Sequence, residues 1–511
     1  MGRIALIAAA LVLAIRLVVL WRVNPTANSD EAIVGLMATQ VAQGGPIPVF
    51  FYGNPYLGSL EALVAAASFL LFGPSTLALR LAPLCLWAAY LALLYALARR
   101  ILGPRGALAA VLVGALPPSF VAVHVELAVG SYSGTLATGL AVLLLADLLA
   151  YPRRRPAWRE DALAGGLGLA SGLALWTHPQ TAPYLVAAAV LLLLRRRDLV
   201  ASRRALLAPL GLAVALAPVV AWNAANDWGT ATFLLGNRRG FFTPFEFLAA
   251  LQGVVTFALP EALGVRPYLS GELVKAAALD LLRWSFPSLV VLGLAWLSIA
   301  QFRSTADPVR RRLLPVLVVV GVNLLLLTAT RFGGDEPPAR YLAPLSSVLP
   351  LVIAWLLLRL RLMVALPLLL AVLVTGANQS LGAHPQPNEE IRTLGGRLEA
   401  IGISRVYAGY WTAYALAFES RGSILVSPRF GPATTDRMPE STLAVEHAPA
   451  SEIAFVFPTD SAQDRAFAGY LADAGIGHTR ESLAGSWHLY YGFPVDPRPT
   501  AELVAAGKPT D

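Results

Sequence analysis

Charged residues are scarce in this chain. Only 14% of the 511 residues are charged, and the mean hydropathy is +0.63, whereas roughly a quarter of the residues in a soluble protein are charged. This composition excludes an ordinary soluble enzyme. Apolar runs recur along most of the sequence, and many have the length of about 20 residues that a membrane-crossing helix needs. The sequence therefore predicts a polytopic α-helical membrane protein.

Residues that bind metals or form disulfides are scarce as well. The single cysteine, Cys85, lies inside an apolar run, so neither an internal disulfide nor a cysteine-based metal site is expected. The six histidines form no HxH or HExxH pair, which argues against a histidine-built zinc site. The net charge of +8 is carried by arginines in short loops. That pattern is typical of cytoplasmic loops in membrane proteins and not of a nucleic-acid surface.

The arginine clusters predict the topology. They fall at Arg99, Arg100 and Arg105; at Arg153, Arg154, Arg155 and Arg159; at Arg195, Arg196, Arg197, Arg203 and Arg204; at Arg303, Arg310, Arg311 and Arg312; and at Arg359 and Arg361. Placing all five clusters on the cytoplasmic side requires a cytoplasmic N-terminus and single crossings between clusters. The first run is expected to be a retained helix and not a cleaved signal peptide, because it is long enough to span and contains Arg16. Arg16 would snorkel to the outer interface or contact a lipid phosphate. The predicted spans number 11 and cover 4–22, 79–98, 106–123, 131–150, 162–177, 181–194, 205–222, 285–302, 313–330, 341–358 and 362–377.

Two further apolar stretches, 57–72 and 245–263, compete as spans. Counting either one alone as a crossing would move a later arginine cluster to the outer side. We therefore expect both to be interfacial or re-entrant helices on the outer face. The external loops 23–78 and 223–284 would then be long and largely helical.

The composition changes after Asn378, where no apolar span remains. Runs rich in Val, Ile and Tyr predict strands, and helical patterns alternate with them, which indicates a small mixed α/β domain. The prediction is a membrane domain over 1–377 and an extracytoplasmic domain over 378–511, with a linker at 384–388. The predicted strands are 404–408, 423–427, 452–457 and 486–491, and the predicted helices are 389–401 and 461–474.

Asp30 and Glu31 follow the first apolar run as an acid pair. They begin a predicted amphipathic helix, 31–43, capped by Ser29 or Asp30. One interpretation is a helix N-terminus at which acids are favoured by the dipole. The other interpretation is catalytic: when a sugar is transferred to an acceptor hydroxyl, a carboxylate has to remove the proton of that hydroxyl.

Glu126 follows the third predicted span on the same outer face. It would be either a solvated loop residue or a second acid in the same cavity. In the cavity it could orient the acceptor or share a divalent cation, Mg or Mn, with Asp30. No other cofactor is expected.

If the sugar donor is a lipid phosphate, the phosphate that leaves during the transfer needs cationic side chains beside it. The preferred one is Arg340 with its neighbour Tyr341, because Asp335 and Glu336 lie just before it in a Pro-rich loop. Snorkelling toward lipid headgroups is the alternative for every arginine in this set. The other outward-facing candidates are His178, Arg80, Arg331, Arg238 and Arg239.

Aromatic and polar residues of the first external loop are candidates for acceptor and sugar binding. Aromatic rings stack on sugar faces, although they also populate interfacial belts. The candidates are Tyr52, Asn54, Tyr56 and Glu61.

These motifs together resemble the GT-C glycosyltransferases, specifically bacterial relatives of protein O-mannosyltransferases and of lipid A aminoarabinose transferases. The resemblance covers roughly 1–377 and rests on the order of the motifs: SDEA at 29–32, YGNPYLGSLEALVAA at 52–66, LFGPSTLALRLAP at 71–83, the acid after the third span, and ARYLAPL at 339–345. It implies an inverting transfer from a polyprenyl-phosphate sugar at the outer leaflet. Asp30 would match the catalytic acid, Glu126 the second loop acid and Arg340 a phosphate-contacting arginine.

The resemblance has limits in this sequence. The aminoarabinose transferases have a lysine near the position of Gly58 and Ser59, whereas the two lysines of this chain are Lys275 and Lys508. The C-terminal domain, which contains GYWTAYALAFES at 409–420, lies outside the resemblance and would be either a cap over the site or an acceptor platform.

The sequence thus predicts a hexosyl- or pentosyltransferase of the inner membrane. Its partners would be the bilayer, a polyprenyl-phosphate sugar and a glycan, lipid or protein acceptor, without nucleic acid. A flippase for lipid-linked sugars is the alternative, but it would need charges at mid-depth in several spans. A non-catalytic receptor would not need so many spans.

Overall fold

The computed structural model describes residues 2–152, 156–199, 202–236, 244–268, 272–303, 308–330, 339–382, 389–429, 436–483 and 485–498. The chain divides into two compact units. The helical unit contains Met1–Trp21, Pro55–Leu60 and Pro83–Pro385. The α/β unit contains Arg22–Asn54, Glu61–Ala82 and Gln386–Asp511, so the first external loop is shared between the two.

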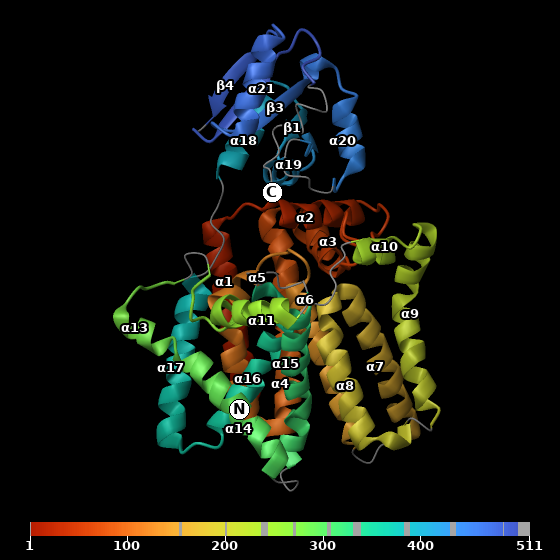
Figure 1. Cartoon of the computed structure of the whole chain (residues 1–511), viewed down its shortest axis with the longest axis vertical. Coiled ribbons are helices and arrows are strands. Elements are labelled where there is room, and N and C mark those ends of the chain that lie inside the picture. Colours follow the sequence, from red (N-terminus) through yellow and green to blue (C-terminus); the bar gives the residue numbers. More distant parts are fainter. Residues whose placement is uncertain are drawn as a thin grey trace. The chain divides into compact units, whose positions relative to one another are not determined.

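Each predicted span coincides with a helix (Figure 1). These helices are α1 (Gly2–Val23), α4 (Thr76–Ala115), α6 (Tyr132–Ala150), α7 (Ala157–Thr177), α8 (Ala182–Arg195), α9 (Arg204–Ala225), α14 (Ser285–Arg303), α15 (Pro308–Ala329), α16 (Ala343–Leu357) and α17 (Leu362–Gly382). Among the described residues, 8 helices are long and apolar enough to cross a membrane. The count of 11 spans stays a prediction, since α7 begins with charged residues, α8 is short, and α4 contains two predicted spans.

Helix α4 is a hairpin of two arms. Gly103 has a φ of 76°, which only glycine adopts readily, and it reverses the chain there. Gly114 of the second arm lies against Leu94 of the first, so the arms are antiparallel. The predicted spans 79–98 and 106–123 are therefore separate helical arms, although the second ends at Ala115 and is followed by α5 (Ser119–His124).

The predicted cytoplasmic clusters meet at one end of the helical unit. Arg312 donates a hydrogen bond to the carbonyl of Arg100 at 2.7 Å, and Arg100 pairs with Asp147 at 2.6 Å. Arg312 and Arg100, from two of the predicted clusters, thus lie at the same end of the helical unit, and the cytoplasmic placement of that end stays a prediction. Arg153, Arg154 and Arg155 lie outside the described residues.

Shorter helices form the two long predicted external loops, including the segments 57–72 and 245–263 that are expected to be interfacial. These are α2 (Ser29–Ala42), α3 (Leu60–Phe72), α10 (Gly229–Gly236), α11 (Pro244–Gly253), the π-helical turn Val254–Ala258, α12 (Leu259–Ala262) and α13 (Ala277–Leu282). Figure 1 shows α11 lying across α15 and not along it. Leu70, Leu71 and Phe72 are exposed at the end of α3, which suits an interfacial helix.

The C-terminal residues form a five-stranded sheet with the order β2-β1-β3-β5-β4. Strand β1 pairs in parallel with β2 and β3, whereas β5 pairs antiparallel with β3 and β4. The strands are β1 (Arg405–Ala408), β2 (Leu425–Ser427), β3 (Ile453–Pro458), β4 (Thr479–Leu483) and β5 (Trp487–Tyr491). The helices are α18 (Glu389–Ala400), α19 (Tyr410–Glu419), α20 (Pro439–Glu446) and α21 (Ala462–Asp473).

The sequence patterns predicted four of these strands and two of these helices. Strand β4 was not predicted because its residues are mostly exposed and polar, so it has no run of buried Val or Ile. Helices α19 and α20 were also not predicted. They are the crossovers that parallel pairing of β1, β2 and β3 requires. The predicted linker 384–388 lies outside the described residues.

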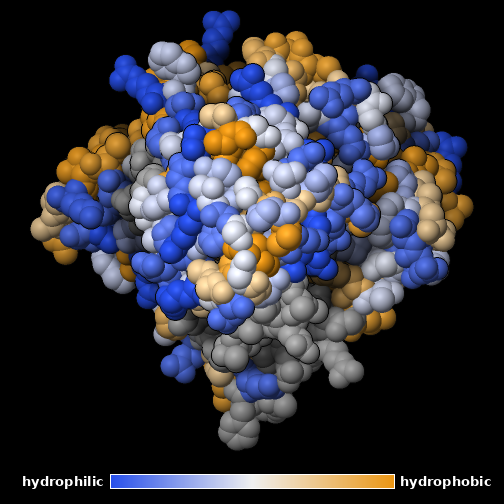
Figure 2. Space-filling model, turned by 90° about the horizontal axis from the view of Figure 1, so that it is seen from above, coloured by the Kyte–Doolittle hydropathy of each residue, from blue (hydrophilic) through white to orange (hydrophobic). Residues whose placement is uncertain are grey.

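Several helices expose large hydrophobic side chains. Large hydrophobic residues are exposed on α1, α9, α14 and α17, as expected of helices in contact with lipid. Figure 2 looks down the long axis, and hydrophilic residues predominate on the face toward the viewer, while hydrophobic ones gather at its edges.

Candidate functional site

Asp30 lies in the first turn of α2, and its neighbours fix the start of that helix. The Asn28 side chain accepts a hydrogen bond from the Glu31 N–H at 3.0 Å, and Glu31 accepts one from the Asn28 N–H at 3.4 Å. This reciprocal pair is a capping box. The predicted cap, Ser29 or Asp30, and the predicted start at residue 31 are therefore wrong. The Asn28 carboxamide reaches the third helical N–H, which leaves the Asp30 carboxylate available for other contacts.

Glu31 and Arg80 neutralise each other inside the α/β unit. Arg80 donates from Nε and Nη2 to the two oxygens of Glu31, both at 2.9 Å, and neither side chain is exposed. Removing one partner would leave a buried, uncompensated charge. This geometry favours a structural role for both residues, whereas the sequence suggested catalysis for Glu31 and phosphate binding for Arg80.

Asp30 itself is half-buried and is held by a residue from the C-terminal sequence. The Tyr410 hydroxyl donates to Asp30 Oδ1 at 2.6 Å, and the Ser29 hydroxyl donates to the Tyr410 carbonyl at 2.6 Å. Tyr410 begins α19, directly after the carboxyl end of β1. Carboxyl ends of parallel strands are the usual place for functional residues in such sheets. That rule, applied to the predicted strand 404–408, is the signal that could have identified Tyr410.

Tyr410 remains a hydrogen-bond donor at neutral pH. Burial raises the pKa of its hydroxyl far above the ordinary value, and the negative charge of Asp30 raises it further. The guanidinium of Arg437 lies 5.9 Å from the Tyr410 ring centroid and 5.6 Å from that of Phe51. Arg437 also donates to the Tyr52 carbonyl at 3.2 Å. Arg437 is a second site residue that the sequence reasoning missed.

Glu419, at the other end of α19, holds the chain that precedes Asp30. Its carboxylate accepts hydrogen bonds from the Ala27 N–H at 3.0 Å and from the Thr76 hydroxyl at 2.6 Å. Arg392 pairs with Glu419 at 3.4 Å and donates to the Asn24 carbonyl at 3.1 Å. The segment 409–420 thus fixes the loop and first turn that carry Asp30.

A second group of predicted residues assembles in the helical unit. Arg340 is exposed, and its guanidinium lies 5.3 Å from the ring centroid of its neighbour Tyr341. Its charge acts on His178 and on Tyr56. Tyr56 contacts His178 edge to face at 6.4 Å and stacks on Phe233 at 5.3 Å. We call these residues, with His124, Tyr132 and Tyr268, the Arg340 cluster.

The histidines of the Arg340 cluster are neutral. Burial lowers the pKa of His124 to about 4 and that of His178 to about 4, and the nearby Arg340 charge contributes to both shifts. The His124 ring packs against Phe120 at 4.1 Å and Tyr132 at 4.8 Å. Arg340 therefore supplies the positive charge in this cluster. The candidates Arg331, Arg238 and Arg239, and the acids Asp335 and Glu336, lie outside the described residues.

Glu126 is occupied by Arg16. The Arg16 guanidinium donates to Glu126 and to Ser380, and it lies 4.8 Å from the Trp87 ring centroid. Arg16 is 1% exposed and Glu126 is 3% exposed. Arg16 therefore does not snorkel to the surface, and Glu126 is not a solvated loop residue, so these two interpretations are wrong. The placement of Glu126 in a substrate cavity stays a prediction. The two charges compensate each other in an apolar interior, where either one alone would be costly.

The predicted acceptor-binding residues are divided between the units. In the α/β unit, the Tyr52 hydroxyl donates to Gln40 at 2.5 Å, and Asn54 closes a turn by donating from its N–H to the Phe51 carbonyl at 2.9 Å. Glu61 is buried in the first turn of α3. Tyr56 belongs to the Arg340 cluster in the helical unit.

A cation at Glu126 would have to compete with the Arg16 guanidinium. Among the residues that the structure describes, no group of three or more His, Cys, Asp or Glu side chains is placed to hold a metal ion. The cation that Asp30 and Glu126 are predicted to share therefore stays a prediction.

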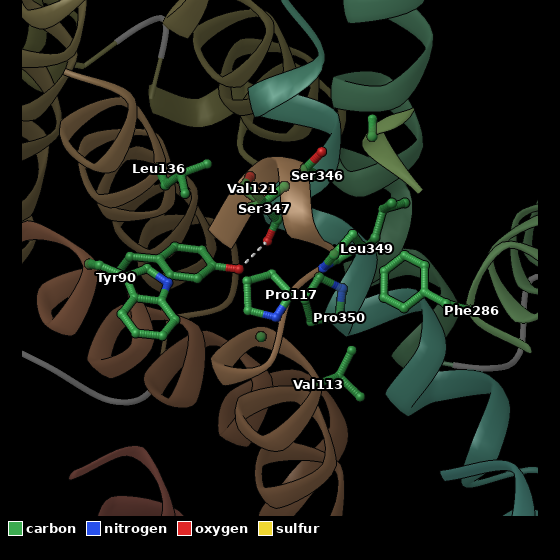
Figure 3. Close-up of a pocket in the computed structure, with 14 residues that line it drawn as sticks. Tyr90, Val113, Pro117, Val121, Leu136, Phe286, Ser346, Ser347, Leu349 and Pro350 are labelled. Carbon is green, nitrogen blue, oxygen red and sulfur yellow. Dashed lines mark hydrogen bonds between the residues drawn. The ribbon is translucent and has the colours of Figure 1, made fainter. Parts of the chain in front are cut away.

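One small cavity in the helical unit is not a substrate site. It measures about 20 Å³ and is lined by Tyr90, Pro117, Ser347 and Pro350 among others (Figure 3). The Tyr90 hydroxyl donates to the Ser347 carbonyl at 3.0 Å across it. This volume has room for about one water molecule.

Comparison with known proteins identifies the fold. Residues 59–222 match the family model described as dolichyl-phosphate-mannose-protein mannosyltransferase. No curated protein sequence matches the chain. The crystal structure of ArnT from Cupriavidus metallidurans bound to undecaprenyl phosphate has a TM-score of 0.64 at 14% identity, covering 97% of this chain and 99% of that chain. Its apo structure gives 0.64 at 13% identity, covering 98% and 99%.

An archaeal enzyme is similar as well. The apo oligosaccharyltransferase from Archaeoglobus fulgidus has a TM-score of 0.51 at 13% identity, covering 99% of this chain and 77% of that chain. The same oligosaccharyltransferase has also been solved in complex with Zn and sulfate. The family match lies within the resemblance predicted from the sequence, and the structural matches extend over nearly the whole chain. The predicted recognition is therefore confirmed: the chain has the fold of the GT-C superfamily of membrane glycosyltransferases.

Proposed function

We propose that this protein transfers a sugar from a polyprenyl-phosphate donor to an acceptor hydroxyl, with inversion, and that Asp30 is the catalytic base. The contrast within the acid pair is the observation that carries this proposal. Glu31 is fully buried and neutralised by Arg80, whereas Asp30 is half-buried and has one oxygen bound by Tyr410. Asp30 is thus the acid of the pair that can still accept a proton.

The proposed reaction needs one base and one leaving group. Asp30 takes the proton of the acceptor hydroxyl, and the acceptor oxygen attacks the anomeric carbon from the face opposite the phosphate. The bond between that carbon and the phosphate oxygen breaks, and polyprenyl phosphate leaves with the bonding electrons. Tyr410 holds the Asp30 carboxylate in one orientation through a 2.6 Å hydrogen bond.

The Arg340 cluster is the proposed site for the donor phosphate. Arg340 is exposed and stands among aromatic rings and neutral histidines. Guanidinium groups match phosphate oxygens and stabilise the charge that grows on a leaving phosphate. His178, Tyr341 and Tyr56 would position the same group. We propose no step through a metal, because Glu126 is paired with Arg16.

The comparisons support the substrate class. The ArnT structure contains undecaprenyl phosphate, and its fold is shared by this chain over nearly its full length. That likeness supports the proposed lipid-linked donor and a multi-pass membrane location. We further propose the cytoplasmic membrane, a cytoplasmic N-terminus and an external C-terminal domain, from the arginine distribution.

The decisive experiment is Asp30→Asn, assayed for sugar transfer in membranes supplied with polyprenyl-phosphate sugars. A general base contributes about 10²- to 10⁴-fold to rate, so a loss of that size is expected while the melting temperature is retained. Transfer at the wild-type rate by this variant would refute the assignment. The matched control is Asp473→Asn, which makes the same change at the exposed end of α21 and should retain full activity.

A further inference from the structure

A cavity of about 590 Å³ opens within the α/β unit. Its volume lies inside the range of about 300 to 1,000 Å³ that is usual for small-molecule sites. The lining comes from the end of α2, the loop after it, the turn before α4, the end of α19, and the segment before α20. The lining residues are Leu36, Thr39, Gln40, Gln43, Gly45, Tyr52, Pro74, Phe418, Arg421, Gly422 and Met438.

Polar groups in this lining are held in place. The Gln40 amide accepts from the Tyr52 hydroxyl at 2.5 Å and donates to the Pro46 carbonyl at 2.7 Å. The Thr39 hydroxyl donates to the Gly35 carbonyl at 2.9 Å, which leaves its oxygen able to accept. Gln43 is exposed beside them. Amides and hydroxyls next to the Tyr52 and Phe418 rings are the combination that binds sugars.

Arg421 adds a positive charge to the cavity wall. It follows α19 with a φ of 55°, a left-handed conformation that is unusual for a residue with a side chain. Its N–H donates to the Phe418 carbonyl and the Gly422 N–H to the Ala417 carbonyl, both at 2.9 Å, and these bonds fix the turn. Arg421 is exposed and makes no ion pair with any residue that the structure describes.

The cavity and Asp30 share helix α2. Thr39 and Gln43 come 9 and 13 residues after Asp30, which places them about 14 to 20 Å along the helix axis. A ligand that lies in the cavity and presents a hydroxyl to Asp30 must be longer than a single sugar ring. The lining combines apolar side chains with hydroxyl, amide and guanidinium groups. This mixture suits a hydroxyl-rich chain whose sugar rings also pack on apolar surface, whereas a polyprenyl tail would leave the polar groups without partners.

We propose that this cavity binds the acceptor, an extended carbohydrate chain, and that Arg421 binds an acidic substituent of that chain. This inference rests on the proposed function, in which Asp30 activates an acceptor hydroxyl. It assigns the acceptor to the α/β unit and leaves the donor phosphate at the Arg340 cluster.

The test complements a deletion strain with variants and measures surface glycan modification by mass spectrometry. Binding of undecaprenyl phosphate to the purified full-length protein in nanodiscs provides the donor-side measurement. Thr39→Trp fills the cavity, and Arg421→Gln removes the charge at an exposed position where folding is not at risk. Each should lower glycan modification by about tenfold or more while undecaprenyl phosphate binding stays within about twofold of wild type. Arg421→Lys should restore much of the modification, because it keeps the charge.

Matched controls are Thr393→Trp and Arg465→Gln, at exposed positions of α18 and α21 outside the cavity. Both should modify glycans like the wild type. Unchanged modification with Thr39→Trp and Arg421→Gln would overturn the acceptor assignment. Loss of undecaprenyl phosphate binding in these variants would overturn it as well, because the cavity would then bind the donor and not the acceptor. Asp30→Asn separates the two proposals, since modification by that variant would refute the catalytic role and not the cavity.

Discussion

The region around Asp30 and the Arg340 cluster carry charges of opposite sign. Asp30 is a carboxylate held by a hydrogen bond from a tyrosine, in a region where the neighbouring acid is neutralised by Arg80. Arg340 is an exposed cation among aromatic rings, beside two histidines that carry no charge at neutral pH. One region can accept a proton and the other can bind an anion, and glycosyl transfer from a phosphate donor needs both.

Two buried ion pairs neutralise other charged residues of these two regions. Glu31 is paired with Arg80 in the α/β unit, and Glu126 is paired with Arg16 in the helical unit. The three acids that the sequence offered as catalytic candidates, Asp30, Glu31 and Glu126, therefore have different surroundings in the structure. Two are neutralised in the interior, and Asp30 is the one of the three that is partly exposed.

The largest expected effect is on stability, from breaking one of these pairs. Arg80→Met leaves Glu31 buried without a partner and should cost about 3 to 5 kcal/mol. The measurement is the melting temperature of the purified protein in detergent, together with its yield. The double variant Arg80→Met with Glu31→Gln should recover much of the loss, because Gln is uncharged and can still complete the capping box. An Arg80→Met protein as stable as the wild type would contradict the structural role and return Arg80 to the phosphate-binding candidates.

The second prediction addresses the Arg340 cluster. Arg340→Gln should weaken undecaprenyl phosphate binding by about 10- to 100-fold, because a hydrogen bond to a charged group contributes about 1.5 to 3 kcal/mol. Binding to the protein in nanodiscs measures this. Arg266→Gln is the matched control, since Arg266 is also exposed and lies 5.3 Å from an aromatic ring, that of Phe257. Equal effects of the two variants would remove Arg340 from the site.

Much of the fold could be predicted because its signals are local. Apolar runs identified the helices, and runs rich in Val, Ile and Tyr identified β1, β2, β3 and β5. The capping box was missed although Asn28 and Glu31 have its spacing, because Ser29 and Asp30 are also good cap residues and the side-chain contacts that decide between them come from the structure. Strand β4 was missed because it takes its place from pairing with β5 and not from buried side chains.

Asp30 and Arg340 were candidates from the sequence alone, but their contacts and the site residues Tyr410 and Arg437 were not predicted. Asp30 and Tyr410 are 380 positions apart, and no spacing rule relates them. The same is true of Arg16 and Glu126, which are 110 positions apart. A sequence shows that a charge is present in an apolar segment. Whether the charge is neutralised depends on which distant residue the fold brings to it, and this contrast is the basis for proposing Asp30 rather than Glu31 or Glu126 as the base.

The third prediction tests the hydrogen bond to Asp30. Tyr410→Phe removes the donor but keeps the ring, and the turnover number should fall by about tenfold as the carboxylate loses its fixed orientation. The Michaelis constant for the donor should change little, since the donor phosphate is assigned to the Arg340 cluster. Tyr407→Phe is the control, because the Tyr407 hydroxyl bonds to Arg498 and not to α2. A Tyr410→Phe variant with full turnover would show that Tyr410 is dispensable for catalysis.

The smallest expected effect is the pH dependence of stability that the Arg340 cluster should impose. The folded protein keeps His124 neutral down to about pH 4, because burial lowers its pKa, whereas an unfolded histidine takes up a proton near pH 6.5. Stability contributed by the neutral imidazole is therefore present above about pH 6.5 and is lost as the pH falls toward 4. His124→Phe keeps an aromatic ring against Phe120 and Tyr132 but cannot titrate. Its melting temperature should fall less than that of the wild type between pH 7 and pH 4.5, by about one to a few degrees. Parallel melting curves for the two proteins over this interval would mean that His124 is charged in the folded state, and the cluster would then present two cations to the donor instead of one.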